Sequence, residues 1–185
     1  MTDSATVAAT AEVLATIVST VGYTSGLGGD AVTQATIAAA AREELIHYNV
    51  LVASGAKPAT TKIWVPDAVF ANRTNFLNTL AAGDQIFVNA YLIGTGVFGT
   101  LGNPGGLAAI TAEFMGVEAV HRALARQSLG LLGNDRVFMA APFTDILTAV
   151  TELKAAGFGF GEVGATPGNS TNSMTSVRAR PTPPG

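Results

Sequence analysis

The chain has 185 residues, of which 48% are hydrophobic and only 12% are charged, and its formal net charge is -3. This length and apolar content favour one globular domain with a substantial core and argue against disorder. The absence of a basic run leaves no electrostatic footprint for nucleic acid. The chain contains no cysteine, which excludes disulfides and thiolate ligands and leaves any metal site to carboxylates and imidazoles.

Residues 85–112 contain no charged side chain, so a membrane span has to be considered. The Gly-Asn-Pro-Gly-Gly sequence at 102–106 interrupts this segment, and neither side offers the roughly 20 continuous apolar residues that a span requires. We therefore expect a pair of buried helices and no transmembrane span. The N-terminus lacks the basic residues of an export signal, which fits a cytoplasmic protein or an exported one whose signal has been removed.

Apolar spacing and end signals predict five helices. Asp3 or Ser4 is expected to cap the first helix, Asp30 the second, and the Asn103-Pro104 pair is expected to supply the N-cap and first residue of the fourth. The second helix should stop before Gly55. The predicted helices span residues 5–21, 31–53, 74–101, 104–129 and 144–156.

Residues 56–72 predict a long crossover between the second and third helices, extended at 61–65 and with a short helical turn at 66–71. The helical domain then covers residues 1–157. The remaining residues, 158–185, are rich in Gly, Pro, Ser and Thr and show no helix or strand pattern. They predict either a flexible C-terminus or an arm that orders against a neighbouring subunit. Such an arm would bury Phe158, Phe160 and Met174.

Both histidines of the chain follow a glutamate by three residues, as Glu44 with His47 and Glu118 with His121. Residues at i and i+3 lie roughly 60° apart around a helix, so each pair can point at one metal ion. Both pairs also fall on core-facing stripes, where a carboxylate without a partner is costly or becomes protonated. Two interpretations follow: a two-metal site, or core hydrogen bonds between the paired side chains without metal.

Two divalent ions bring four positive charges into a dry core, so a two-metal site needs further anions from the other long helices. Beyond the cap, Glu12 is the only acidic residue in the first helix, and Asp84 is the only one in the third. Each of the four long predicted helices therefore supplies a carboxylate to the candidate site.

A Glu on the first helix, Glu-x-x-His on the second and fourth, and a carboxylate on the third resemble the ferritin-like di-iron or di-manganese carboxylate bundle. Three local sequences carry the resemblance further: Ala-Arg-Glu-Glu-Leu-Ile-His at 41–47 followed by Ala-Ser-Gly-Ala-Lys-Pro, Asp-Gln-Ile-Phe-Val-Asn-Ala-Tyr at 84–91, and Val-Glu-Ala-Val-His at 117–121. They are similar to the bacterial ferritin-like group that includes desiccation-related proteins. The likeness covers residues 5–160.

The resemblance implies an all-α fold, a ferritin-like up-down four-helix bundle with a long crossover, a short fifth helix and an irregular tail. It also implies that Glu44 and Glu118 bridge or cap two metal ions, that His47 and His121 each bind one, and that Glu12 is a terminal ligand. Asp84 departs from the pattern, because its side chain is one methylene shorter than that of Glu. It would fall about 1.5 Å short unless the third helix moves closer or a water intervenes.

Five further residues lie near the predicted ligands in the sequence. Tyr91 follows Asp84 by two turns and is either a hydrogen-bond donor to the ligands or a packed aromatic. Glu43 and Glu113 lie roughly 100° to 140° off the ligand stripes and are expected at the surface or behind a ligand. Arg122, like Arg126 one turn later, is expected to form surface ion pairs.

A carboxylate-rich ligand set without sulfur favours iron or manganese. The resemblance implies redox chemistry with oxygen or peroxide, and hence a di-metal oxidoreductase if the protein is an enzyme. The alternative is a structural or assembly subunit that keeps the fold with an empty or vestigial metal site. The low charge of the chain and the apolar residues of its tail favour this alternative. They also predict self-association or a protein partner. Metal storage in a cage is a third possibility.

Overall fold

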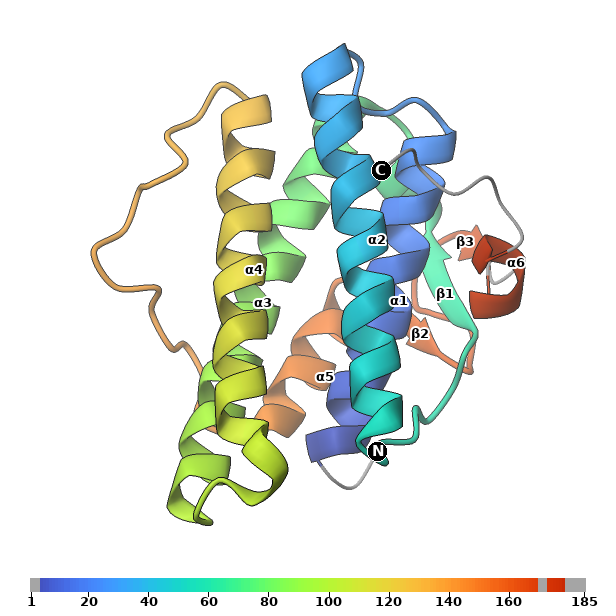
Figure 1. The fold of residues 1–185 in the computed structure, drawn as a ribbon. Helices are drawn as coiled ribbons and strands as arrows, with labels where there is room; N and C mark the ends of the chain where they lie inside the picture. Colours follow the sequence, from blue (N-terminus) through green and yellow to red (C-terminus); the bar gives the residue numbers. More distant parts are fainter. Residues whose placement is uncertain (1–3, 170–172, 179–185) are drawn as a thin grey trace.

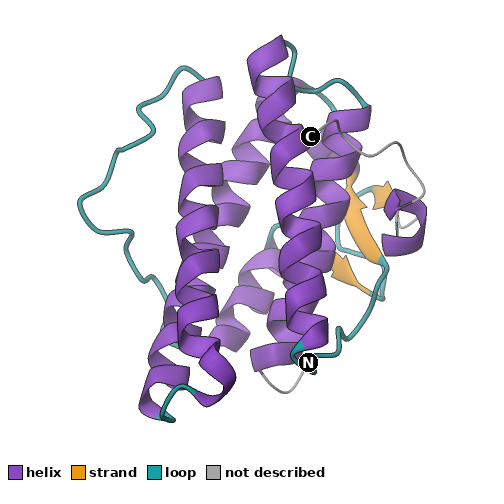
Figure 2. Cartoon of the chain, viewed as in Figure 1, coloured by secondary structure: helices purple, strands orange, loops and turns teal. Residues whose placement is uncertain are grey.

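Four long helices dominate the computed structural model of the chain, which describes residues 4–169 and 173–178 (Figure 1). They pack in two pairs, α1 on α2 and α3 on α4, and the pairs meet where α1 contacts α3 and α2 contacts α4. The predicted all-α class is confirmed in part, because the described residues are mostly helical but also form a small sheet (Figure 2). The long helices are α1 (Ser4–Thr24), α2 (Ala31–Ala53), α3 (Arg73–Thr100) and α4 (Leu107–Ser128).

The helix ends follow local chemistry. The Asp30 side chain accepts a hydrogen bond from the Thr33 N–H and caps α2, as predicted. Asn103 and Pro104 hold the predicted N-cap and first positions of a short 3-10 turn (Pro104–Gly106), whereas the N-cap of α4 itself is Gly106. Asn103 still contributes, since its side chain accepts a hydrogen bond from the Ala108 N–H in the first turn of α4.

The predicted crossover is present between α2 and α3. It contains strand β1 (Ile63–Pro66) and a 3-10 turn (Asp67–Phe70), which match the expected extended segment and helical turn. Because the crossover returns the chain along the helices, α2 and α3 run in the same direction (Figure 1). This connection lets all four helices face a common interior.

The expectation of an irregular tail is wrong for its described part. Strands β2 (Gly159–Phe160) and β3 (Gly168–Asn169) pair antiparallel with the two edges of β1, and a short helix α6 (Met174–Arg178) follows. The backbone N–H and C=O groups at both edges of β1 need hydrogen-bond partners, and the two strands of the tail supply them. Residues 170–172 and 179–185 lie outside the described residues.

The side chains assigned to an intersubunit arm pack within their own chain. Phe158 and Met174 are buried in the core and Phe160 is half-buried against it, so they do not extend towards a neighbouring subunit. The tail is glycine-rich because its backbone passes close to Trp64. A Cβ on Gly168 would clash with the Val65 carbonyl and the Trp64 ring.

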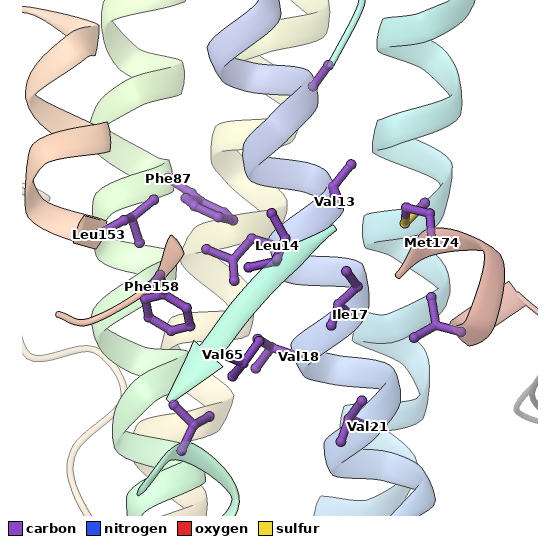
Figure 3. Packing of buried hydrophobic residues seen from close by; sticks show 14 of the residues in the cluster. Val13, Leu14, Ile17, Val18, Val21, Val65, Phe87, Leu153, Phe158 and Met174 are labelled. Carbon is purple, nitrogen blue, oxygen red and sulfur yellow. The ribbon is translucent and has the colours of Figure 1, made fainter. Parts of the chain in front are cut away.

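Helix α1 lies in the middle of the packed elements. It contacts α2, α3, β1, α6 and α5 (Ile146–Ala155), and its apolar side chains meet all of them (Figure 3). α1 is long and apolar enough to cross a membrane by length and composition, but 72% of its most apolar window is buried in the structure. Packing on all sides accounts for that composition.

A long loop joins α4 to α5 and is tied to α4 by an ion pair. Arg122 is buried, and its two terminal nitrogens lie 2.7 and 3.0 Å from the carboxylate oxygens of Asp135. Arg126 also contacts Asp135, at 3.1 Å. The prediction of a surface pair is therefore wrong for Arg122, whose guanidinium is held beneath the loop.

We expect Asp135→Ala to release this loop, because the buried Arg122 guanidinium then loses its bidentate partner. The hydrogen bond from Arg122 holds the pKa of Asp135 at about 2. A lowered pKa means that the wild-type tether is fully present above the usual Asp pKa near 4 and is lost as the pH falls towards 2. Limited proteolysis at neutral pH should cleave the loop several-fold faster in the variant. Equal cleavage rates would contradict the tether.

Candidate metal centre

The six predicted ligands converge from four helices into one buried cluster. Their candidate ligand atoms fall into two overlapping groups, and within each group these atoms lie within 4.8 Å of one another. Two carboxylates, those of Glu44 and Glu118, belong to both groups. The first group adds Glu12 and His47, and the second adds Asp84 and His121.

Helix geometry positions each of these side chains. In both Glu-x-x-His pairs the two residues share one face of their helix, α2 or α4, and that face is buried. The Nδ1 atom of His121 lies 3.0 Å from a Glu44 oxygen. The Nδ1 atom of His47 lies 3.5 Å from a Glu118 oxygen and 3.6 Å from a Glu44 oxygen. Both imidazoles thus turn the same nitrogen towards the shared carboxylates.

The cluster concentrates polar atoms that have no hydrogen-bond partner. Among the described residues, nine buried side-chain nitrogen or oxygen atoms lack one, and all except those of Thr16 and Asn89 belong to the six predicted ligands. Both oxygens of Glu118 are in this state, and its side chain is fully buried. Buried polar groups normally find a partner, so this donor set fits a bound cation.

His121 is held from behind by Glu43. The Nε2 atom of His121 lies 2.6 Å from a Glu43 oxygen, and the Glu43 side chain reaches solvent on its other side. A carboxylate in this position accepts the Nε2 proton and leaves Nδ1 free to bind a metal. Of the two places predicted for Glu43, the structure supports the one behind a ligand. Glu113 is exposed on the surface.

Tyr91 and Phe114 complete the surroundings of the first group. The Tyr91 hydroxyl donates a hydrogen bond to Glu12, and its ring packs edge-on against Phe114, with ring centroids 5.4 Å apart. Tyr91 therefore combines both predicted roles. Phe114 stacks on His47 at a centroid distance of 3.9 Å. Nothing in the apolar pattern of the sequence specifies that Phe114 covers an imidazole.

Asp84 reaches the cluster despite its shorter side chain. One of its oxygens lies in the second group, and its Oδ2 atom is buried without a partner. The packing of α3 on α4 places the helix close enough for the shorter Asp84 side chain to reach the ligand atoms of Glu118 and His121.

The protein without metal distributes protons over the cluster. Burial and the neighbouring Glu44 charge raise the pKa of Glu12 and of Glu118, and burial with the Glu118 charge raises that of Asp84. Burial opposes protonation of His47, but the surrounding carboxylates outweigh it and raise the pKa of His47 to about 12. Metal ions must displace these protons, so the apparent metal affinity rises with pH.

Searches against protein family models, curated proteins and solved structures find no match to this chain. The case for a metal centre therefore depends on the residues themselves. What the geometry establishes is a buried cluster of carboxylates and imidazoles whose ligand atoms are close enough together to hold metal ions.

We expect Glu43→Ala to weaken binding at the His121 side of the cluster by about 10- to 100-fold, because His121 loses the group that orients it. Glu43→Gln keeps a hydrogen-bond acceptor and should stay within a few-fold of the wild type. Competition against a chromophoric chelator measures both affinities. Equal binding by the alanine variant and the wild type would show that Glu43 has no positioning role.

Proposed function

We propose that α1 to α4 form a ferritin-like four-helix bundle that binds two iron or manganese ions and supports redox chemistry with oxygen or peroxide. The observation that carries this proposal is the cluster of unpartnered buried atoms on Glu12, Glu44, His47, Asp84, Glu118 and His121. The resemblance of the sequence to ferritin-like proteins and the long crossover between α2 and α3 also support it.

Charge supports two ions rather than one. The four carboxylates of the cluster carry four negative charges when ionised, and two divalent cations supply four positive charges. One divalent ion would leave two uncompensated negative charges in a site from which solvent is largely excluded. Because Glu44 and Glu118 belong to both groups, they are the residues that would hold the two ions together.

The remaining ligands divide between the two ions. His47 and Glu12 would hold the first ion, and His121 and Asp84 the second. Iron or manganese suits this carboxylate-rich set, which contains one imidazole for each group and no sulfur. When bound, such ions supply electrons to oxygen or peroxide, chemistry that amino-acid side chains do not provide.

The protein's own side chains orient the ligands and shield part of the site from solvent. Tyr91 holds Glu12 through its hydroxyl, and Glu43 holds His121 through Nε2. Phe114 covers one face of His47 and shields it from solvent. A rigid and shielded ligand shell limits side reactions of reactive oxygen with the chain.

Anaerobic titration with Fe²⁺, followed by addition of oxygen, tests the proposal. We expect saturation at about two ions per chain, with oxygen consumed in proportion to the bound iron. Saturation at two ions without oxygen consumption would contradict the redox part alone. A protein that binds no transition metal and keeps its thermal stability would contradict the whole proposal.

Exposed apolar side chains favour a second candidate, an assembly subunit. In the loop between α4 and α5, Val137 is 92% exposed and the adjacent Phe138 is 85% exposed. Paired apolar side chains so far in solvent are typical of a protein contact. Sedimentation should then show an oligomer that dissociates when both residues are changed to serine. A wild type that stays monomeric at all concentrations would count against self-assembly.

A further inference from the structure

A cavity of about 270 Å³ lies beside the cluster, between α1, α3 and α5. Two carboxylates of the candidate metal centre, Glu44 and Asp84, line it directly. The cavity therefore touches the second group of ligands, the one that contains His121. Its position makes it the place where a molecule could meet bound metal ions.

The other walls of this cavity are mostly apolar, and their polar side chains are those of Ser19, Asn78 and Thr79. Leu14 comes from α1, Phe87 from α3, Leu153 from α5, and Phe158 from the segment after α5 (Figure 3). Apart from Glu44 and Asp84, no charged side chain of the described residues lines it. A concave, apolar space with a few convergent polar groups is the usual form of a small-molecule site.

The cavity opens to solvent at one side. Asn78 and Ala82 on α3 and Ala156 after α5 line it and are exposed, so its mouth lies between these two elements. Its volume exceeds the 150 Å³ or so of an engineered apolar cavity that holds benzene. A hydrated metal ion gains nothing from apolar walls, because they cannot replace its water ligands. The lining thus fits an organic molecule better than ions in transit.

We propose that this cavity binds a neutral, apolar organic molecule of about one to two aromatic rings or the equivalent alkyl length, with one end against Glu44 and Asp84. A charged ligand is disfavoured, because the apolar walls cannot replace the water that solvates its charge. As a substrate site the cavity rests on the proposed function, but the binding itself does not. It distinguishes the protein from a store of metal ions, which needs no organic site.

Gly83 gives a direct way to fill the cavity without disturbing the fold. It lies inside α3 and lines the cavity, and a Cβ at this position would have no atom within 4 Å. Gly83→Leu therefore adds a side chain in open space and favours the helix. Gly96 is the matched control, because it lies on the same helix, also has open space at its Cβ, and does not line the cavity.

The test is a fluorescence titration with 6-propionyl-2-(dimethylamino)naphthalene, a neutral and mostly apolar probe with two fused rings, on metal-loaded and metal-free protein. We expect saturable binding of one probe per chain, weakened at least about tenfold in Gly83→Leu and unchanged in Gly96→Leu. Metal content, measured on the same samples, should be equal in all three proteins.

The outcomes separate this proposal from the proposed function. No saturable binding, or equal affinity in the wild type and Gly83→Leu, would overturn the cavity proposal even when two metal ions are bound. Binding that depends on Gly83 in a protein that takes up no metal would support the cavity and overturn the di-metal function instead.

Discussion

Glu118→Gln should reduce metal binding from about two ions per chain to fewer than one. Glu118 is fully buried, belongs to both groups of ligand atoms, and has two oxygens without a hydrogen-bond partner. The amide has nearly the same shape but carries no charge, and its NH₂ group cannot bind a cation. The loss of affinity should exceed the roughly 100-fold that is typical for residues behind the ligands. Metal analysis after equilibrium dialysis measures the effect.

The metal content of two other Glu→Gln variants provides the comparison for Glu118→Gln. Glu12→Gln removes a ligand from the first group only, so we expect it to lower the content by about one ion. Glu113→Gln alters an exposed residue on the same helix as Glu118 and should leave two ions bound. If Glu118→Gln and Glu113→Gln hold the same amount of metal, Glu118 is not a shared ligand.

Removing the metal should lower the melting temperature by about 10–20 °C. A ligand that binds only the folded state at 100 times its Kd contributes about 2.7 kcal/mol, so two ions contribute about 5 kcal/mol. For a chain of this size each kcal/mol shifts the midpoint by roughly 2–4 °C. The shift arises because the cations neutralise carboxylates that otherwise repel one another in the core.

Thermal unfolding in the presence of a chelator, and again after Mn²⁺ is restored, measures this effect. The Glu118→Gln protein is the control, since a specific effect of metal must disappear when the shared ligand is gone. An equal rise in melting temperature in that variant would mean that Mn²⁺ stabilises the protein elsewhere.

The convergence of the six ligands was predictable from local rules. Helical periodicity places Glu44 and His47 on one buried face, and it places Glu118 and His121 on another. Two divalent ions need more negative charge than the two pairs supply, and that requirement adds Glu12 and Asp84 to the same set. Neither inference depends on how distant segments pair, so both could be made from the sequence alone.

Structural features that form between distant segments of the chain could not be predicted from such local patterns. The glycines of the tail carry no periodic pattern and therefore predict irregular structure, yet they allow the backbone to pair with β1 beside Trp64. Arg122 was expected at the surface because its partner, Asp135, lies in a loop with no recognisable signal. The cavity beside Asp84 needs α3 and α5 in place together, and no segment specifies it alone.

Anomalous diffraction from crystals grown with Mn²⁺ tests the central claim most directly. We expect two peaks per chain, both bordered by Glu44 and Glu118, with His47 and Glu12 at one and His121 and Asp84 at the other. A cluster without anomalous peaks, or with Mn²⁺ bound only outside these residues, would contradict the di-metal centre.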